Sequence, residues 1–471
     1  MHNVLAFDFG ASTGRAILGH FDGEKITYEE IHRFDNVPIM DNGRIMWNFP
    51  ALLSEVKKTV ASCKNADSLA FDTWGVDYGM LDADDNLVGL PANYRDSRTN
   101  GMPEKVFEKI SPDKLYSATG NQIMAINTLF QLMAEDCNPQ AKTMLFMPDL
   151  FSWALCGSKT ADRTIASTSQ MINPLTGDWD HSITALTPFA KEFFPKIVDC
   201  ATVCGEYKGI AVVKVAGHDT QCAVAAMPWD GNGQAAFLSC GTWSLIGCEL
   251  DKPVLTKKSM EDELSNELGA NGKINYLKNI SGLWLIQEIR RNFRSEGKEY
   301  SYNDMEQLAR KEEAFTCFID PDAAEFAQPG NMPQKIRAYC QRTGQTVPQT
   351  DGALVRCIYE SLAMKYRFAI AQIEENTDKK FEVLHLLGGG TKDTFLCQMT
   401  ADALGIPVVA GPTEATALGN ILLQLTALGA VKDVAQGRSI LRKTEKVTEY
   451  CPENTDKYSA VYSAFCEIIK K

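Results

Sequence analysis

The sequence has little that would suit a nucleic-acid or membrane partner. Its 47 Lys and Arg are outnumbered by 60 Asp and Glu, which leaves a formal net charge of −13 over 471 residues. A nucleic-acid-binding protein needs a basic face for the phosphates, so this charge argues against such a partner. No apolar run is long enough to span a bilayer, and the start MHNVLAFDFG lacks the basic stretch and long apolar core of a signal peptide. We therefore predict a cytoplasmic protein with no nucleic-acid partner and no membrane partner.

Cysteine pairs at zinc-binding spacing are also missing. The 14 cysteines are scattered along the chain, and Cys200 and Cys204, the closest pair, have no second cysteine or histidine pair at a matching spacing. Scattered cysteines of this kind are typical of reduced, mostly buried side chains. The sequence thus gives no sign of a structural zinc site, and it leaves open whether any cysteines pair.

What is present is an alternation of strand-like and helix-like segments, which predicts an α/β fold. At 471 residues the chain should divide into two or three domains. A strand–turn–strand pattern at 4–18 recurs at 235–248, which suggests two related halves. The stretch MPWDGNG, 227–233, is the best candidate boundary because it combines Pro with two Gly. We place the first domain at 1–229 and the second at 230–471, the latter ending in a peripheral helical extension.

Local patterns predict individual elements. The run VVKVA, 212–216, predicts a buried strand, and QCAVAAM, 221–227, predicts a helix after it. FEVLHLL, 381–387, predicts another buried strand, and TKDTFLCQMTADALG, 391–405, predicts a helix that ends at its glycine. LKNISGLWLIQE, 277–288, has the pattern of the start of an amphipathic helix.

Three turns rich in small residues follow strand-like runs: FDFGASTGR at 7–15, SCGTWSL at 239–245 and GGGTKD at 388–393. Glycine lets the backbone approach an anion closely, and successive N–H groups with hydroxyls can hold a phosphate. Each turn alone is equally well explained as an ordinary polar turn, but three in an α/β chain favour a nucleotide site. None is a Walker A motif or a GxGxxG before a helix. Asp8, at a strand end, could hold a hydrated magnesium ion against the phosphate.

Two further segments carry candidate chemistry. GHDT, 217–220, places His218, Asp219 and Thr220 where a strand meets a loop. Asp219 or Thr220 could cap the following helix, or Asp219 could be a catalytic carboxylate. FDTWGVDYG, 71–79, sets a Trp beside Gly75, where its ring could flank a sugar, although Trp is more often a core side chain.

Together these motifs resemble the FGGY carbohydrate kinases, members of the actin–hexokinase–Hsp70 ATPase superfamily. The resemblance covers nearly the whole chain: DFGASTGR and GTWSL look like the phosphate signatures, and 388–420 is similar to the C-terminal family signature. It implies two ribonuclease-H-like α/β domains with the active site in the cleft between them. Within the family, DTWGVDYG, YRDSRTNG and GHDT are most similar to the kinases that phosphorylate L-rhamnulose. Gly217 and Cys240 depart from the pattern, because serine is common at both positions.

The resemblance also implies roles for single residues. It implies that Asp219 is the general base, and that the sugar is contacted by Gly75, His218, Asp219, Thr220 and Asn279. It implies ATP contacts from Ala11, Ser12, Thr13, Gly14, Arg15, Thr242, Gln287 and Gly389. With Asp8 as the magnesium residue, the expected cofactors are ATP and Mg²⁺.

The expected reaction is the transfer of phosphate from ATP to L-rhamnulose, giving L-rhamnulose 1-phosphate in L-rhamnose degradation. A sugar hydroxyl ionises far above neutral pH, so a carboxylate that takes its proton assists the transfer. L-fuculose, a stereoisomer, or another ketose is the alternative acceptor, because discrimination depends on hydroxyl contacts. An actin-like or Hsp70-like ATPase that gates a protein partner is the alternative of a different class. The sequence is silent on oligomeric state.

Overall fold

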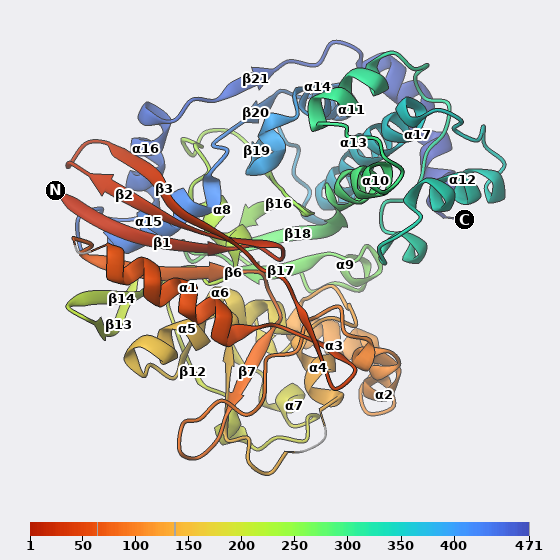
Figure 1. Cartoon of the computed structure of the whole chain (residues 1–471). Helices are drawn as coiled ribbons and strands as arrows, with labels where there is room; N and C mark the ends of the chain where they lie inside the picture. Colours follow the sequence, from red (N-terminus) through yellow and green to blue (C-terminus); the bar gives the residue numbers. More distant parts are fainter. Residues whose placement is uncertain (64, 136–137, 471) are drawn as a thin grey trace. The chain divides into compact units, whose positions relative to one another are not determined.

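The structure is a computed structural model that describes residues 1–63, 65–135 and 138–470. It divides into two units, drawn in Figure 1. The first unit comprises Met1–Asp230, Glu249–Tyr276 and Glu414–Glu445, and the second comprises Gly231–Cys248, Leu277–Thr413 and Lys446–Lys471. The longest segment of the first unit ends within the 227–233 stretch, and two later segments of the chain complete this unit.

The first unit is built on a six-stranded sheet with the order β13-β14-β6-β1-β2-β3. Neighbours β1 and β6, and β6 and β14, are parallel, whereas β1–β2, β2–β3 and β13–β14 are antiparallel. The strands are β1 (His2–Phe9), β2 (Thr13–Phe21), β3 (Ile26–Asp35), β6 (Ser68–Thr73), β13 (Thr202–Tyr207) and β14 (Ile210–Lys214). The predicted strands at the start of the chain and at 212–216 are therefore confirmed, the latter as β14.

Alternation along β1 sends its side chains to two different faces of the sheet. Leu5, Phe7 and Phe9 pack in a core with α1 (Phe49–Ser62) and α5 (Met147–Cys156), which lie along one face in Figure 1. The opposite face meets α15 (Ala415–Ala427), which packs on β1, β6 and α8 (Asp219–Ala225). Ser68 and Asp72 of β6 hydrogen-bond to Gln424 and Asn420 of α15, at 2.7 Å each. The polar side chains of Ser68 and Asp72 on β6 therefore point toward α15.

The other elements of the first unit are shorter. The paired strands are β4 (Ile39–Asp41) with β5 (Arg44–Met46), β7 (Tyr78–Leu81) with β8 (Thr143–Phe146), β9 (Thr160–Asp162) with β12 (Lys196–Val198), and β10 (Ile172–Asn173) with β11 (Asp178–Trp179). The helices are α2 (Met102–Phe107), α3 (Pro112–Thr119), α4 (Thr128–Met133), α6 (Arg163–Ala166), α7 (His181–Thr184), α9 (Lys257–Glu261) and α16 (Val434–Thr444), and β17 (Ser265–Leu268) is a further strand.

The strands of the second unit are hydrogen-bonded in the order β18-β16-β15-β19-β20-β21. They are β15 (Ala235–Cys240), β16 (Trp243–Leu250), β18 (Ile274–Ser281), β19 (Val383–Leu387), β20 (Val408–Ala410) and β21 (Thr448–Tyr450). β15 pairs antiparallel with β16 and parallel with β19, β19 pairs parallel with β20, and β20 pairs antiparallel with β21. The first unit has the same succession of pairings in β2-β1-β6-β14-β13. The predicted relation between the two halves is confirmed.

The helices of the second unit are α10 (Trp284–Ser295), α11 (Tyr302–Arg310), α12 (Met332–Arg342), α13 (Asp351–Thr377), α14 (Thr394–Leu404) and α17 (Thr455–Ile468). The predicted helix at 391–405 is confirmed as α14, which begins after the N-cap Asp393 and ends at Gly405 in the left-handed conformation. The prediction for 277–288 was wrong in its first half. Residues up to Ser281 belong to strand β18, and the helix starts only at Trp284, after Gly282.

Three further sequence predictions can be compared with the structure. The C-terminal extension is not wholly helical, because β21 pairs with β20 before α17 begins. None of the cysteines that the structure describes is in a disulfide, and Cys137 lies outside the described residues. Over the described residues, no helix combines the length and the apolar character needed to cross a membrane.

Candidate active site

Three aspartates gather where the parallel strands of the first unit end. Asp8 of β1 lies opposite Asp72 of β6 in the strand register, and Asp219 opens α8 shortly after β14. Neighbouring parallel strands end at one edge of a sheet, which is where α/β proteins bind ligands. Burial, together with the charges of Asp8 and Asp219, raises the pKa of Asp72 well above its ordinary value. The three carboxylates therefore interact electrostatically.

Asp72 and Asp8 have different partners. One oxygen of the buried Asp72 accepts the bond from Asn420, and the other has no hydrogen-bond partner among the described residues. Asp8 is ion-paired with Arg15, which also contacts Glu414. A buried carboxylate oxygen without a hydrogen-bond partner is energetically costly, so binding of a proton or a cation to this oxygen of Asp72 is favourable. Asp72 was part of a motif noted in the sequence, but nothing there distinguished it as a member of this cluster.

Asp219 does not cap its helix in the usual way. His218 occupies the N-cap position without a side-chain bond to the helix, and Asp219 is the first helical residue. Asp219 Oδ1 accepts from the N–H of its immediate neighbour Thr220 at 2.6 Å, whereas a cap accepts from an N–H two or three residues on. Its side chain is 33% exposed, and burial of the carboxyl raises the pKa of Asp219 to about 6. These features favour a reactive carboxylate over a structural cap.

His218 is held by an acidic residue from a distant segment. Its Nδ1 lies 2.9 Å from Oε2 of Glu267, which also accepts a 2.7 Å bond from Gln221. Burial opposes a charge on the ring, but the charge and hydrogen bond of Glu267 outweigh it and raise the pKa of His218. His218 Nε2 is 3.5 Å from Asp219 Oδ1. A cationic imidazole there stabilises the ionised form of Asp219.

The backbone before His218 is fixed by close packing. Gly217 donates to Asp162 Oδ1 at 2.9 Å and accepts from the N–H of Thr73 at 2.9 Å. A Cβ on Gly217 would lie 2.9 Å from Cγ of Pro148 and 3.1 Å from Cβ of Ile165. A serine at this position, common in the family that the sequence resembles, would not fit without a shift of these neighbours.

Gly75 is followed by a strained residue. Val76 has φ of 68°, a left-handed conformation that is costly for a β-branched side chain. Its N–H donates to Thr168 Oγ1 at 3.0 Å, and its carbonyl accepts from Thr128 Oγ1 at 2.7 Å. Trp74 is buried, so its ring is a core side chain and not an open surface for a sugar. The hydroxyls of Thr168 and Thr128 therefore hold the backbone of Val76 in this unusual conformation, and strained backbone of this kind is common at functional sites.

The segment 11–15 spans the end of the turn between β1 and β2 and the first three residues of β2, Thr13, Gly14 and Arg15. Gly10 N–H donates to Thr13 O at 2.9 Å, and Asn36, which the sequence did not single out, bonds to the carbonyls of Gly10 (2.9 Å) and Ser12 (3.0 Å). A Cβ on Gly14 would lie 2.3 Å from the ring of Phe34, so packing alone requires this glycine. Ala11, Ser12 and Thr13 remain at the tip of the turn, with Ser12 exposed.

In the second unit, the structure brings Thr242, Gln287 and Gly389 into one region. Thr242 lies in the β15–β16 turn, and its Oγ1 is 3.5 Å from Gln287 Oε1. Because β15 and β19 are parallel neighbours, the glycines after β19 lie beside the end of β15. A Cβ on Gly390 would be 2.3 Å from Cys240 Sγ, and Gly388 has φ of 84°, so both must be glycine. A Cβ on Gly389 would have no neighbour within 4 Å.

The predicted sugar residues divide between the two units. Gly75, His218, Asp219 and Thr220 belong to the first unit, where His218 contacts both Glu267 and Asp219. Asn279 lies on β18 in the second unit and is partly exposed. The first unit can thus exchange a proton and hold a cation, and the second unit offers an open glycine turn beside a hydroxyl and an amide.

Comparison with known proteins settles the family. Residues 3–237 match the N-terminal domain of the FGGY family of carbohydrate kinases, and 236–428 match its C-terminal domain. The chain belongs to the FGGY family of carbohydrate kinases. This FGGY chain is therefore a carbohydrate kinase, an enzyme, and the family prediction is confirmed.

Three curated relatives of this FGGY kinase are named rhamnulokinase. That of Bacteroides thetaiotaomicron is 39% identical and covers 99% of each chain. The protein of Oceanobacillus iheyensis is 38% identical over 95% of this chain and 97% of its own, and that of Halalkalibacterium halodurans is 38% identical over 96% and 99%. The prediction that the sequence is most similar to this subgroup is confirmed.

Solved structures show the fold of this FGGY kinase. Xylulose kinase from Lactobacillus acidophilus matches with a TM-score of 0.80 at 16% identity, covering 99% of this chain and 98% of that one. Plasmodium falciparum glycerol kinase, solved with ADP, matches with a TM-score of 0.78 at 14% identity and the same coverage. The predicted two-domain α/β fold of the actin–hexokinase type is confirmed.

Proposed function

We propose that this FGGY kinase transfers the γ-phosphoryl group of ATP to the 1-hydroxyl of L-rhamnulose. The observation that carries the proposal is the end-to-end similarity to three rhamnulokinases at 38–39% identity. The GHDT and DTWGVDYG segments that suggested this substrate lie in one unit, with the accessible Asp219 next to the fixed turn at 217. A small polar ketose is an appropriate ligand for such a set of groups.

Asp219 is the proposed general base. The attacking hydroxyl gives its proton to the Asp219 carboxylate as the new P–O bond forms, which avoids a free alkoxide. A pKa of about 6 leaves this carboxylate ionised at neutral pH and more basic than an ordinary aspartate. His218, Thr220, Gly75 and Asn279 are the proposed contacts that orient the ketose. When its ring is protonated, His218 lowers the pKa of Asp219 and so favours the ionised base.

Magnesium fits the carboxylates of the first unit. Mg²⁺ prefers oxygen ligands and keeps several of its waters, and Asp72 has a buried oxygen without a partner next to Asp8. Because Asp8 is already paired with Arg15, we assign it to a hydrated ion rather than to direct coordination. When bound, the ion neutralises charge on the ATP phosphates.

Gly389 supports the proposed ATP site. The conformation of Gly388 and the Cys240 contact of Gly390 explain why those two residues are glycine, but neither reason applies to Gly389. A ligand that approaches the backbone would explain the missing side chain there. The proposed ATP contacts are Gly389, Thr242 and Gln287 with the 11–15 turn, whose members are Ala11, Ser12, Thr13, Gly14 and Arg15.

Turnover of the purified chain on L-rhamnulose, on L-fuculose and without any ketose tests the proposal. We expect kcat/KM for L-rhamnulose to exceed that for L-fuculose at least about tenfold, since hydroxyl contacts discriminate strongly. Phosphorus NMR should place the phosphate on the 1-hydroxyl. The reverse preference would make the chain an L-fuculose kinase. ATP hydrolysis at the same rate with and without every ketose would contradict sugar phosphorylation and favour the ATPase alternative.

A further inference from the structure

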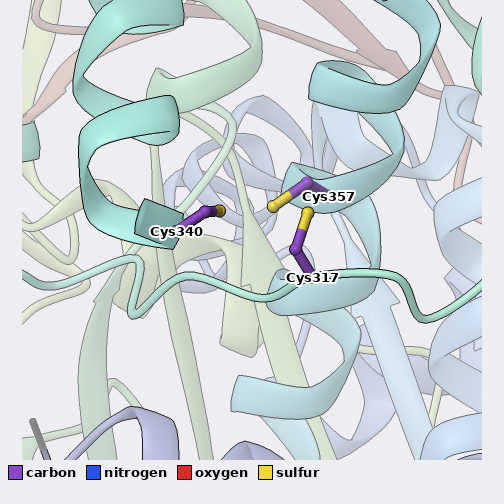
Figure 2. Close-up of side chains that lie close together, drawn as sticks. All are labelled: Cys317, Cys340 and Cys357. Carbon is purple, nitrogen blue, oxygen red and sulfur yellow. The ribbon is translucent and has the colours of Figure 1, made fainter. Parts of the chain in front are cut away.

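Three cysteines from separate parts of the sequence meet inside the second unit. Cys317 lies in the segment between α11 and α12, Cys340 lies near the end of α12, and Cys357 lies in the first half of α13. Their sulfur atoms are all within 4.8 Å of one another, and all three residues are buried. Figure 2 shows the sulfurs of Cys317 and Cys357 pointing toward each other, with the Cys340 side chain directed at them from its own helix.

The backbone that carries Cys317 is fastened on both sides. Main-chain N–H groups before and after it donate to buried side chains, so the position of its sulfur is set by the fold. These bonds run from Phe315 to Glu360 Oε2 (2.8 Å), from Phe318 to Gln345 Oε1 (2.7 Å) and from Ile319 to Ser361 Oγ (2.9 Å). Phe315 has φ of 60°, a left-handed conformation that a side chain rarely adopts without such support. These hydrogen bonds hold the backbone of Cys317 in place beside α12 and α13, although Phe315 adopts an unfavourable backbone conformation.

The side chain of Glu360, which fastens the loop before Cys317, has a cationic partner. Its Oε2 accepts from Phe315 N–H, and its Oε1 accepts from Arg356 Nε at 2.7 Å, so it does not add an unbalanced charge. A cysteine binds a metal as its thiolate, and this group can offer three sulfur atoms to one ion.

We propose that Cys317, Cys340 and Cys357 bind one thiophilic d¹⁰ metal ion, Cu(I) or Zn(II), through their three sulfur atoms. Metal–sulfur bonds of about 2.3 Å around one ion place its sulfurs roughly 3.8 Å apart, so small side-chain rotations suffice. Each thiol that binds gives its S–H proton to solvent, and no electron is transferred.

The number of ligands favours the monovalent ion. Within the described part of the chain, no fourth His, Cys, Asp or Glu joins this group at the same distance. Structural zinc sites have four protein ligands, whereas soft thiolates also select Cu(I). We therefore expect Cu(I) to be bound more tightly than Zn(II). The site would connect α12, α13 and the segment between α11 and α12.

Metal retention by the full chain tests this site. The reduced, metal-free protein is loaded anaerobically with Cu(I) or with Zn(II), excess metal is removed, and metal per chain is measured by mass spectrometry. We expect about one Cu(I) per chain, with Cys317→Ala, Cys340→Ala and Cys357→Ala each losing most of it. The matched control is Cys63→Ala, another buried cysteine, which lies in the first unit and should retain the wild-type amount.

Retention of Zn(II) but not Cu(I), with the same loss in the three variants, would keep the site and assign it to the divalent ion. If the variants fail to fold, X-ray absorption of the loaded wild-type chain decides instead, because the proposal requires three sulfur neighbours around the ion. Wild-type protein that keeps neither metal overturns the proposal. So does equal retention in folded Cys317→Ala, or an ion surrounded by oxygen and nitrogen.

Discussion

The two units share one sheet topology and differ in what stands at the strand ends. In the first unit the ends of β1 and β6, and the start of α8 after β14, carry Asp8, Asp72 and Asp219. In the second unit the ends of β15 and β19 carry Cys240 and the glycines from Gly388 onward. The topology determines where a ligand can bind, and the side chains at that edge determine the chemistry. The same sheet topology thus presents carboxylates at the strand ends of one unit and glycine backbone at the strand ends of the other.

The largest expected effect comes from removing the proposed general base of the first unit, Asp219. Asp219→Asn keeps the size and most of the hydrogen bonding of the side chain but removes its ability to accept a proton. Loss of a general base costs on the order of 10²–10⁴ in rate. We expect a folded protein that binds ATP and ketose and barely forms sugar phosphate, measured as kcat together with the melting temperature.

A true helix cap provides the matched control for that variant. Asp180 caps α7 by accepting from Ser182 N–H at 3.0 Å, and Asn caps about as well as Asp. Asp180→Asn should therefore leave both kcat and the melting temperature unchanged. If Asp219→Asn behaved like Asp180→Asn, with turnover within a few-fold of wild type, the catalytic role of Asp219 would be wrong.

The next effect concerns the cation. Asp8→Ala removes the proposed partner of hydrated magnesium and leaves Arg15 with Glu414. Residues that hold a metal indirectly are typically worth 10–100-fold in metal affinity, so the magnesium needed for half-maximal rate should rise by roughly that factor. Ketose binding, measured by calorimetry, should be largely spared. An unchanged magnesium titration would give Asp8 a structural role only.

The pH profile tests the charge state of Asp219. Its folded pKa of about 6 lies above the ordinary value of 3.8, and the base must be ionised to act. We therefore expect kcat/KM to be constant above about pH 6 and to fall about tenfold for each pH unit below that value. His218 lowers the pKa of Asp219, so in His218→Gln the fall of kcat/KM at acidic pH should begin at a higher pH. A profile without an acidic limb would contradict the assignment.

The smallest expected effect separates two neighbouring glycines of the second unit. Gly389→Ala adds a methyl group with no protein neighbour within 4 Å, so it should leave the melting temperature unchanged and raise the KM for ATP several-fold. Gly390→Ala places a Cβ against Cys240 Sγ and should destabilise the fold by about 1–3 kcal/mol. Thermal unfolding and ATP kinetics on both variants provide the comparison. An unaltered KM in Gly389→Ala would remove Gly389 from the ATP site.

Features with a local cause were predictable from the sequence. Short apolar runs predicted β1, β14 and β19, and the Gly turns after β1, β15 and β19 were placed correctly, because run length and backbone freedom are properties of a few adjacent residues. The end of α14 at Gly405 was predicted for the same reason, whereas its start after Asp393 was seen only in the structure. The predicted helix before Gly282 was wrong because a short apolar run fits a strand or a helix equally well. Pairing in the sheet made this segment strand β18.

Tertiary structure alone decided which residues meet and how they are charged. Glu267 binds His218 across 49 positions of sequence, and Asn420 binds Asp72 across 348. The same holds for Cys317, Cys340 and Cys357, whose spacing resembles no metal motif although their sulfurs meet. The raised pKa of Asp219 has the same origin, since it depends on burial and on neighbouring charges that folding supplies. The sequence determined the residue types and the local turns, and only folding set their distances and their solvent exposure.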